Sequence, residues 1–213
     1  MSAPLTQATA MAVREALGAK YGMSWGTKGG IPWAAAALGF DIARMFGAQI
    51  PTGARFVGEY ITTLGLTVFY PAGKSFSPEQ LIEIDTHETR HGHQFVAEPG
   101  VMPFEYIRNS RRRAEYESAA FGDGLAVRWA LTGEIPASVN DLPHGALLEY
   151  GCTSADLQMV QDQLEAVVTS ISHGVIPEGP ARTTIATIAR VQPDALDPRA
   201  EALIRANSPG VLS

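Results

Sequence analysis

The sequence predicts a mainly helical α+β protein, and three observations lead to this prediction. Several segments repeat apolar residues at helical spacing, one central segment is rich in β-branched and aromatic residues, and glycines or prolines separate them. The length of 213 residues, with 46% hydrophobic and 18% charged residues, is that of an ordinary globular protein. We therefore expect a globular domain over residues 1–174 and an extended arm over residues 175–213.

Two helices are expected in the N-terminal quarter of the chain. Residues 4–19 carry apolar side chains at helical spacing, and the glycines that follow end this segment. Residues 32–46 form a mostly apolar run that stops before Pro51, which predicts a buried helix. The longest apolar stretch, residues 29–40 between Lys28 and Asp41, is only 12 residues long, and a membrane span needs about 20, so we expect no membrane partner.

The next segment changes to the pattern of β-structure. Residues 55–71 are largely β-branched and aromatic and are interrupted by Gly65, which predicts a short hairpin that turns there. Ser77 and Gln80 then have the types and spacing of a capping box, with a proline at the first helical position between them. A helix is therefore expected over residues 77–95.

The second half of the chain predicts two more long helices before the proline-containing arm. Residues 109–131 form a helical segment that ends at Gly133, and residues 156–171 form another. Beyond Gly174, five prolines interrupt short apolar runs, and each removes a backbone donor. We therefore expect an extended arm with at most short helices, of the kind that binds a protein assembly partner.

Charge and cysteine content exclude several classes of function. The net charge is −6, from 16 basic and 22 acidic residues, so the chain lacks the basic excess that nucleic acid attracts. Cys152 is the only cysteine and cannot form an internal disulfide. Arg14 and Lys20 interrupt the region where a signal peptide needs an apolar run, so we expect a cytoplasmic or particle-associated protein.

The strongest chemical signal is an HExxH motif in the helix expected over residues 77–95. His87 and His91 are four residues apart, so a helix presents both imidazoles on one face, where they can bind one metal ion. Glu88 lies beside them, in the position of a general base for a water molecule at that metal. The spacing predicts a zinc site with these three residues.

A catalytic zinc site takes three protein ligands and leaves one position open, so a third donor is needed. His93 lies about 200° around the helix from His91 and cannot join the same metal. The acidic candidates are Glu115 and Glu117 in the segment 109–131, and both are followed by small residues that would let the two helices approach closely. The residues by themselves leave both alternatives open.

Three motifs together resemble a known family. They are TTLGLTVFYP at residues 62–71, HETRHGHQ at residues 87–94 and RAEYESAAF at residues 113–121. An HExxH followed by a glutamate on a later helix resembles the gluzincin branch of the zincin metallopeptidases. The three motifs in this order are most similar to small bacterial and phage-encoded zincin-like proteins, and the resemblance covers about residues 55–130.

This resemblance implies a zincin-like core in which the hairpin packs beside the HExxH helix, with Glu117 as the third zinc ligand. An alternative alignment, to the ExEAD helix of other gluzincins, favours Glu115, although Ser118 and Ala119 stand where that pattern has alanine and aspartate. In both cases zinc would polarise a water and a peptide carbonyl, and Glu88 would act as general base and later as proton donor to the leaving amine.

The resemblance also suggests roles for residues around the metal. The strand at residues 67–70 would lie beside the cleft and pair with an extended substrate. Tyr106 is a candidate oxyanion donor. Gln94 and Asp123 are candidate hydrogen-bond partners of the ligating imidazoles, because such ligands usually donate their second N–H to a polar group.

The sequence leaves two functions open. The first is a zinc-dependent peptidase that acts on a peptide or protein substrate, and the intact Glu88 favours it because a structural zinc needs no base. The second is a non-enzymatic structural or assembly protein, such as a component of a phage particle, that uses a zinc-binding zincin scaffold. The proline-containing arm favours this second function.

Overall fold

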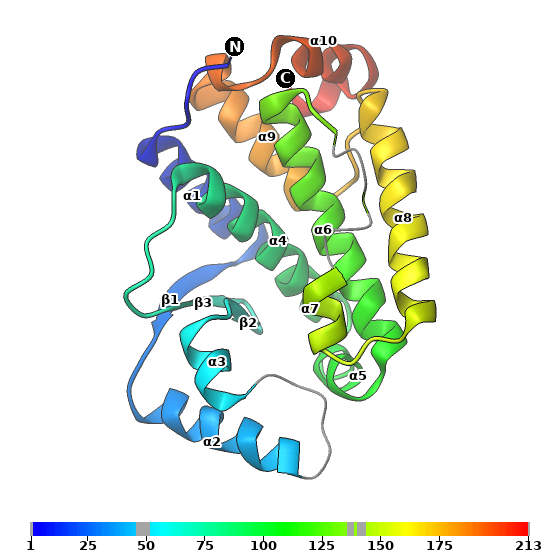
Figure 1. The fold of residues 1–213 in the computed structure, drawn as a ribbon. Coiled ribbons are helices and arrows are strands. Elements are labelled where there is room, and N and C mark those ends of the chain that lie inside the picture. Colours follow the sequence, from blue (N-terminus) through cyan, green and yellow to red (C-terminus); the bar gives the residue numbers. More distant parts are fainter. Residues whose placement is uncertain (1, 46–51, 136–138, 140–143, 213) are drawn as a thin grey trace.

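The computed structural model describes residues 2–45, 52–135, 139 and 144–212. The fold is mainly helical with one small three-stranded sheet, as the sequence predicts (Figure 1). Its elements are α1 (Gln7–Tyr21), β1 (Ser24–Lys28), α2 (Ile31–Met45), α3 (Gly53–Gly58), β2 (Thr62–Leu64), β3 (Thr67–Pro71), α4 (Pro78–Ala97), α5 (Met102–Arg108), α6 (Ser110–Thr132), α7 (His144–Glu149), α8 (Ser154–Ser172), α9 (Pro180–Val191) and α10 (Pro198–Asn207). Short 3-10 turns follow α9 and α10.

The helical core forms around α6, which packs against α4, α8 and α9 (Figure 1). Helix α1 packs against both α4 and α9 and buries Val13 and Leu17 completely. Ile82 of α4 and Leu164 of α8 are also fully buried in this core. Burial of these apolar side chains holds α4 and α6 side by side, which is the arrangement on which the candidate site depends.

The sheet has the strand order β1-β3-β2. Strands β2 and β3 are antiparallel and form the predicted hairpin, whose turn contains Gly65 at a φ of 62°, in the left-handed region that favours glycine. Strand β1, which the sequence did not predict, pairs in parallel with β3. Gly26 weakens the local strand signal of this segment, and its missing side chain permits the close pairing, because a Cβ there would lie 3.1 Å from the ring of Phe69.

The first residues of the expected hairpin segment form a helix instead of a strand. Helix α3 covers residues up to Gly58, and the Thr52 side chain accepts from the backbone N–H of Arg55 at its start. This local cap overrides the β-branched and aromatic composition of the segment. The strand prediction was therefore wrong for residues 55–58.

Helix α4 begins as the sequence predicts. The Ser77 side chain accepts from the backbone of Gln80, the Gln80 side chain accepts from the backbone of Ser77, and Pro78 is the first helical residue. Two turns further on, buried Asp85 accepts hydrogen bonds from Arg14, Trp25 and Tyr70. This cluster ties α1, β1 and β3 to the face of α4 opposite the candidate site, which fixes the position of the helix.

The expected extended arm is not present, because residues 180–191 and 198–207 form α9 and α10. Ile185, Ile188 and Ile204 are fully buried in the main core, and Thr184 contacts the Thr86 hydroxyl of α4 at 2.8 Å. The prolines stand at the first positions of these helices, where their missing N–H costs nothing. The prediction of an extended arm was therefore wrong.

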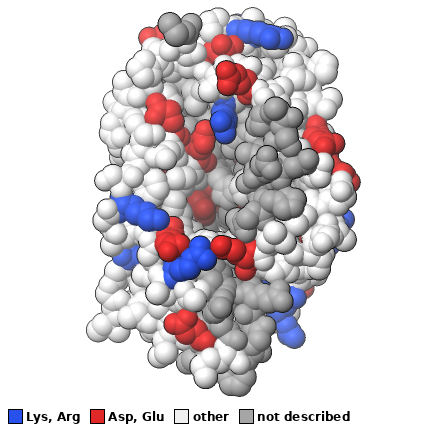
Figure 2. Space-filling view, viewed as in Figure 1, with Lys and Arg blue, Asp and Glu red and all other residues white. Residues whose placement is uncertain are grey.

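No helix in the described ranges combines the length and the apolar character that a membrane span requires. On the face of the molecule in Figure 2, acidic and basic side chains are interspersed.

Candidate metal centre

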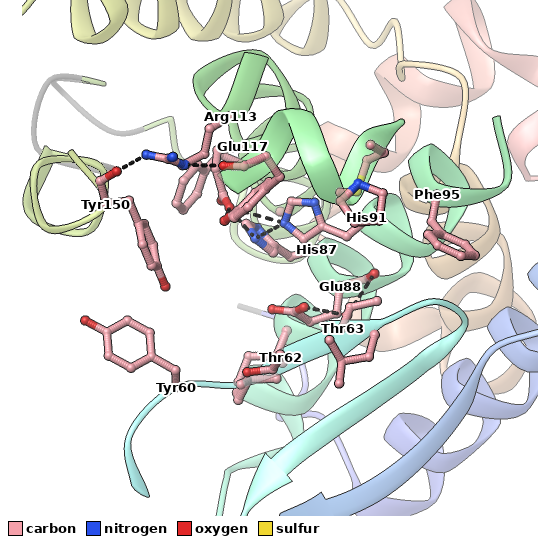
Figure 3. A pocket seen from close by; sticks show the side chains of 18 of the residues that line it. Tyr60, Thr62, Thr63, His87, Glu88, His91, Phe95, Arg113, Glu117 and Tyr150 are labelled. Atoms are coloured by element: carbon pink, nitrogen blue, oxygen red, sulfur yellow. Dashed lines mark hydrogen bonds and ion pairs between the residues drawn. The ribbon is translucent and has the colours of Figure 1, made fainter. Parts of the chain in front are cut away.

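Helices α4 and α6 bring three donor groups together. His87 and His91 lie one turn apart on α4, and their Nε2 atoms are 3.2 Å from each other. The Glu117 carboxylate of α6 lies opposite them, with Oε2 at 3.5 Å from His87 Nε2 and Oε1 at 3.5 Å from His91 Nε2. Figure 3 shows these side chains pointing toward one another from the two helices.

Glu115, the alternative third ligand, points toward two arginines and not toward the histidines. The Glu115 carboxylate accepts from Arg112 at 2.8 Å and lies 3.6 Å from Arg111, and a third of its side chain is exposed. These are ion pairs on the surface of α6. Of the two glutamates that the sequence left open, the structure therefore brings only Glu117 to the histidines.

The donor group is shielded from solvent, which strengthens its electrostatic interactions. Burial by itself lowers the pKa of His91, but the charge and hydrogen bond of Glu117, together with Glu88 and Gln94, raise that pKa to about 9. Burial raises the pKa of Glu117, but the charge of His91 and the hydrogen bonds of both histidines lower it well below its usual value. In the protein without metal, Glu117 is therefore ionised and His91 holds a proton more tightly than an ordinary histidine.

Gln94 determines which nitrogen of His91 faces this group. The Gln94 side-chain amide donates to the carbonyl of Tyr116 at 3.0 Å, so its oxygen faces His91 and accepts from Nδ1 at 2.9 Å. A neutral His91 thus carries its proton on Nδ1 and directs the Nε2 lone pair toward His87 and Glu117. The hydrogen bond that the sequence suggested for Gln94 is present.

The sequence also suggested that Asp123 accepts a hydrogen bond from a ligating imidazole, and this suggestion was wrong. Its carboxylate accepts from Nε of Arg90 at 2.5 Å and from the backbone N–H of Ala181 at 3.3 Å. Asp123 therefore anchors the start of α9 to α4 and α6. The guanidinium of Arg90 is the nearer and stronger donor, so the carboxylate is satisfied without an imidazole.

Glu88 extends from α4 toward the hairpin. Its Oε2 atom accepts a hydrogen bond of 2.6 Å from the hydroxyl of Thr63, which holds the carboxylate at the edge of the pocket (Figure 3). Thr63 belongs to β2, whereas β3 is the central strand of the sheet, covered on both edges. The strand beside the pocket is therefore β2, and the expectation that residues 67–70 pair with a substrate was wrong.

Tyr106 of α5 also reaches the donor group. Its hydroxyl donates to Oε1 of Glu117, and burial followed by the charge of this carboxylate raises the pKa of Tyr106 well above its usual value. The tyrosine thus stays protonated and orients Glu117. Its proton is directed at the carboxylate and not at the open part of the pocket.

Arg113 of α6 links α5 to the residue that follows α7. No role for it was predicted from the sequence. It is only 6% exposed, and its guanidinium donates to the carbonyls of Tyr106 at 2.6 Å, Ile107 at 2.8 Å and Tyr150. The C-terminal ends of α5 and α7 thus converge on one buried cation, which suits the negative end of a helix dipole. Its position one turn before Glu117 on α6 was the signal that could have identified it.

The donors open onto a pocket of about 720 Å³. Tyr60 and Tyr150 lie at one side of it, with their ring centroids 5.7 Å apart (Figure 3). Most of the other residues that line the pocket are apolar, among them Leu64, Ile84, Phe95, Ile107, Phe121 and Leu125. Such a pocket, with a few convergent polar groups, is typical of a site for a small molecule or a peptide.

The separations of the donors suit a tetrahedral zinc ion. Zinc bonds of about 2.0–2.1 Å at tetrahedral angles place the donors about 3.3–3.5 Å apart. The two Nε2 atoms are 3.2 Å apart, and each lies 3.5 Å from a different oxygen of Glu117, Oε2 for His87 and Oε1 for His91. One ligand atom from each of the three residues lies within 4.8 Å of the others. Two imidazoles and one carboxylate are also a donor set that catalytic zinc sites use.

Comparisons with protein families, with curated proteins and with solved structures find no match to this chain.

Proposed function

We propose that the chain is a zinc-dependent peptidase with a zincin-like site, in which His87, His91 and Glu117 hold the metal. The observation that carries this proposal is the convergence of two imidazoles and one carboxylate: the Nε2 atoms are 3.2 Å apart, and each lies 3.5 Å from one oxygen of Glu117. Glu88 lines the same pocket. A zinc ion at this position supplies Lewis acidity, which polarises a peptide carbonyl and lowers the pKa of water.

The residues around the metal would divide the reaction between them. Glu88 takes a proton from the attacking water on its carboxylate and transfers it to the nitrogen of the leaving amine. Thr63 holds that carboxylate in place through its hydroxyl. Gln94 fixes the tautomer of His91, and Tyr106 fixes the orientation of Glu117.

The edge of the sheet suggests how a substrate binds. Strand β2 is an edge strand and lines the pocket with Thr62, Thr63 and Leu64. An extended peptide can add to such an edge through main-chain hydrogen bonds, which is a common mode of peptide recognition. Glu88, held by Thr63, then faces the peptide bond that lies beside the metal.

Zinc content is the first test of this proposal. We expect protein supplied with zinc to bind about one equivalent by elemental analysis, and His87→Ala or Glu117→Ala to lower that content strongly, because each removes a ligand. Glu115→Ala is the matched control and should bind zinc like the wild type, because Glu115 pairs with arginines on the surface. Zinc content below about a tenth of an equivalent in the wild type would refute the proposal.

The structure removes the feature that favoured the second function, a non-enzymatic scaffold protein. That feature was an extended arm free to bind an assembly partner, and the corresponding residues form α9 and α10 in the core. The scaffold becomes the preferred function only if zinc-loaded protein cleaves no peptide in a broad library.

A further inference from the structure

Lys28 is the last residue of β1, and it is only 1% exposed. Lysine is rarely buried to this extent, because its ammonium group loses its hydration. Here all three N–H groups of the ammonium have acceptors. Nζ donates to the carbonyl of Phe56 at 2.6 Å, to the carbonyl of Tyr60 at 2.8 Å and to the hydroxyl of Thr62 at 2.6 Å. The buried cation therefore binds the chain from α3 to β2 at three points.

Two aromatic rings and a carboxylate also act on this ammonium. Nζ lies 4.1 Å from the centroid of the Phe56 ring and 5.1 Å from the centroid of the Trp33 ring, and both are cation–π distances. Burial lowers the pKa of Lys28 to about 8, although the charge of Glu88 acts in the opposite direction. Lys28 is therefore mostly protonated at neutral pH, and its charge interacts with that of the candidate general base.

The hydrogen bond to Thr62 crosses the whole sheet. Lys28 belongs to β1 and Thr62 belongs to β2, and β3 lies between these two edge strands. Phe69 of β3 pairs with Thr62, and its ring lies 4.9 Å from the ring of Trp33 in α2. Helices α2 and α3 lie on the side of the sheet opposite α4 (Figure 1). Lys28 thus joins the two edges of the sheet on the face away from the metal-binding helix.

Thr63, the next residue of β2, points to the other face of the sheet, because successive side chains of a strand alternate between its faces. On that face the Thr63 hydroxyl donates to the carboxylate of Glu88 at 2.6 Å (Figure 3). A buried ammonium therefore holds β2 from one face, and β2 holds the candidate general base on the other. A shift of β2 in the sheet would move Thr63 and would weaken its contact with Glu88.

We propose that Lys28 is a positioning residue of the peptidase site, which fixes β2 in the sheet so that Thr63 holds the carboxylate of Glu88. This inference rests on the proposed peptidase function. Phe56, Tyr60 and Thr62 line the pocket, and Lys28 donates to them from behind. Because its three N–H groups are occupied, the ammonium has none left for a substrate, and it acts only through β2.

Hydrogen exchange of the backbone tests whether the ammonium fixes β2, and it needs no turnover. Thr62→Val keeps the β-branched shape but removes one acceptor of the ammonium, whereas Thr62→Ser keeps the hydroxyl. We expect the β2 amides that pair with β3 to exchange roughly tenfold faster in Thr62→Val and at the wild-type rate in Thr62→Ser. Unchanged exchange in Thr62→Val and in Lys28→Met would overturn the inference.

Lys74→Met is the matched control for Lys28→Met. Lys74 also donates to a carbonyl of this segment, that of Glu59 at 3.1 Å, but this contact is exposed and is a single hydrogen bond. The control loses the same charge at a site that does not hold β2. Its exchange in β2 and its kcat should therefore equal those of the wild type.

A double-mutant cycle tests whether Lys28 acts through Thr63. Lys28→Met keeps the apolar stem of the side chain, and in zinc-loaded protein it should lower kcat for peptide hydrolysis about tenfold while zinc content stays unchanged. In protein that already carries Thr63→Val, the same substitution should lower kcat no more than about twofold, because the link to Glu88 is already broken. An equal loss in both backgrounds would overturn the inference. Thr62→Val takes the place of Lys28→Met in this cycle if the latter does not fold.

The outcomes distinguish this inference from the peptidase proposal. If zinc-loaded wild type cleaves peptides but Lys28→Met leaves kcat unchanged, the inference is wrong and the peptidase proposal stands. If the wild type cleaves no peptide while exchange in β2 depends on the Thr62 hydroxyl as expected, Lys28 fixes β2 and the peptidase proposal fails.

Discussion

The side-chain oxygen of Gln94 lies 2.9 Å from Nδ1 of His91. His91 precedes Gln94 by three residues on the same helix, α4. Because the Gln94 amide donates to the carbonyl of Tyr116, this contact links the imidazole to the backbone of α6. The second metal-binding helix thus fixes the orientation of a ligand on the first. Such links keep ligands in position before the metal binds.

Replacement of Gln94 by leucine should weaken zinc binding without unfolding the protein. The substitution keeps a side chain of similar size but removes the acceptor of the Nδ1 proton, so we expect about a 10- to 100-fold loss of zinc affinity. Competition with a chromogenic chelator measures this affinity. Unchanged affinity, with an unchanged thermal transition, would show that Gln94 does not orient the ligand.

Replacement of Thr63 by valine should lower the rate of peptide hydrolysis and leave zinc content unchanged. Valine keeps the β-branched shape that suits β2 but removes the hydroxyl that holds Glu88 at 2.6 Å. We expect kcat to fall about tenfold, because a general base must be positioned within hydrogen-bond reach of its proton. Loss of zinc together with activity would instead indicate a structural effect.

Zinc affinity should rise with pH through the neutral range. The charge and hydrogen bond of Glu117, together with Glu88 and Gln94, raise the pKa of His91 to about 9 in the protein without metal, so a proton occupies the imidazole below that pH. Zinc must displace this proton, and its apparent affinity should increase up to about pH 9 and then level off. Calorimetry at pH 7 in buffers of different ionisation enthalpy should show about one proton released per zinc. No buffer dependence would contradict this linkage.

The C-terminal helices should be essential for folding. Ile188 of α9 is fully buried, so Ile188→Ala should lower the free energy of unfolding by about 2–5 kcal/mol. Val191→Ala on the same helix is the control and should cost much less, because Val191 is 44% exposed. Urea denaturation measures both. A chain truncated after residue 174 that still unfolds cooperatively would show that α9 and α10 are dispensable.

How far the sequence predicts this fold depends on how local each signal is. The capping box at Ser77 and Gln80 predicts the start of α4 correctly, because its partners lie within one turn. The prolines of the C-terminal region mislead, because Pro180 and Pro198 can interrupt a helix or begin one, and only packing against the core decides which. Strand β1 depends on pairing with β3, some 40 residues away, and has no strong local pattern.

The candidate site shows the same limit. The spacing of His87 and His91 predicts that they share one face of a helix, and they do. The choice between Glu115 and Glu117 depends on how α6 is rotated against α4, which no local pattern specifies. Tyr150 lines the pocket from the end of α7, and its contact with Arg113 joins residues 37 positions apart, so sequence spacing gave no signal for it.

The most direct test of the central claim is peptide hydrolysis by zinc-loaded wild type and the Glu88→Gln variant, compared near pH 7. Glutamine preserves the size of the side chain and the helix but cannot accept the proton of the attacking water. We predict that zinc content and thermal stability stay nearly unchanged while hydrolysis falls by roughly 10²-fold or more. Equal hydrolysis by the two proteins would contradict the account.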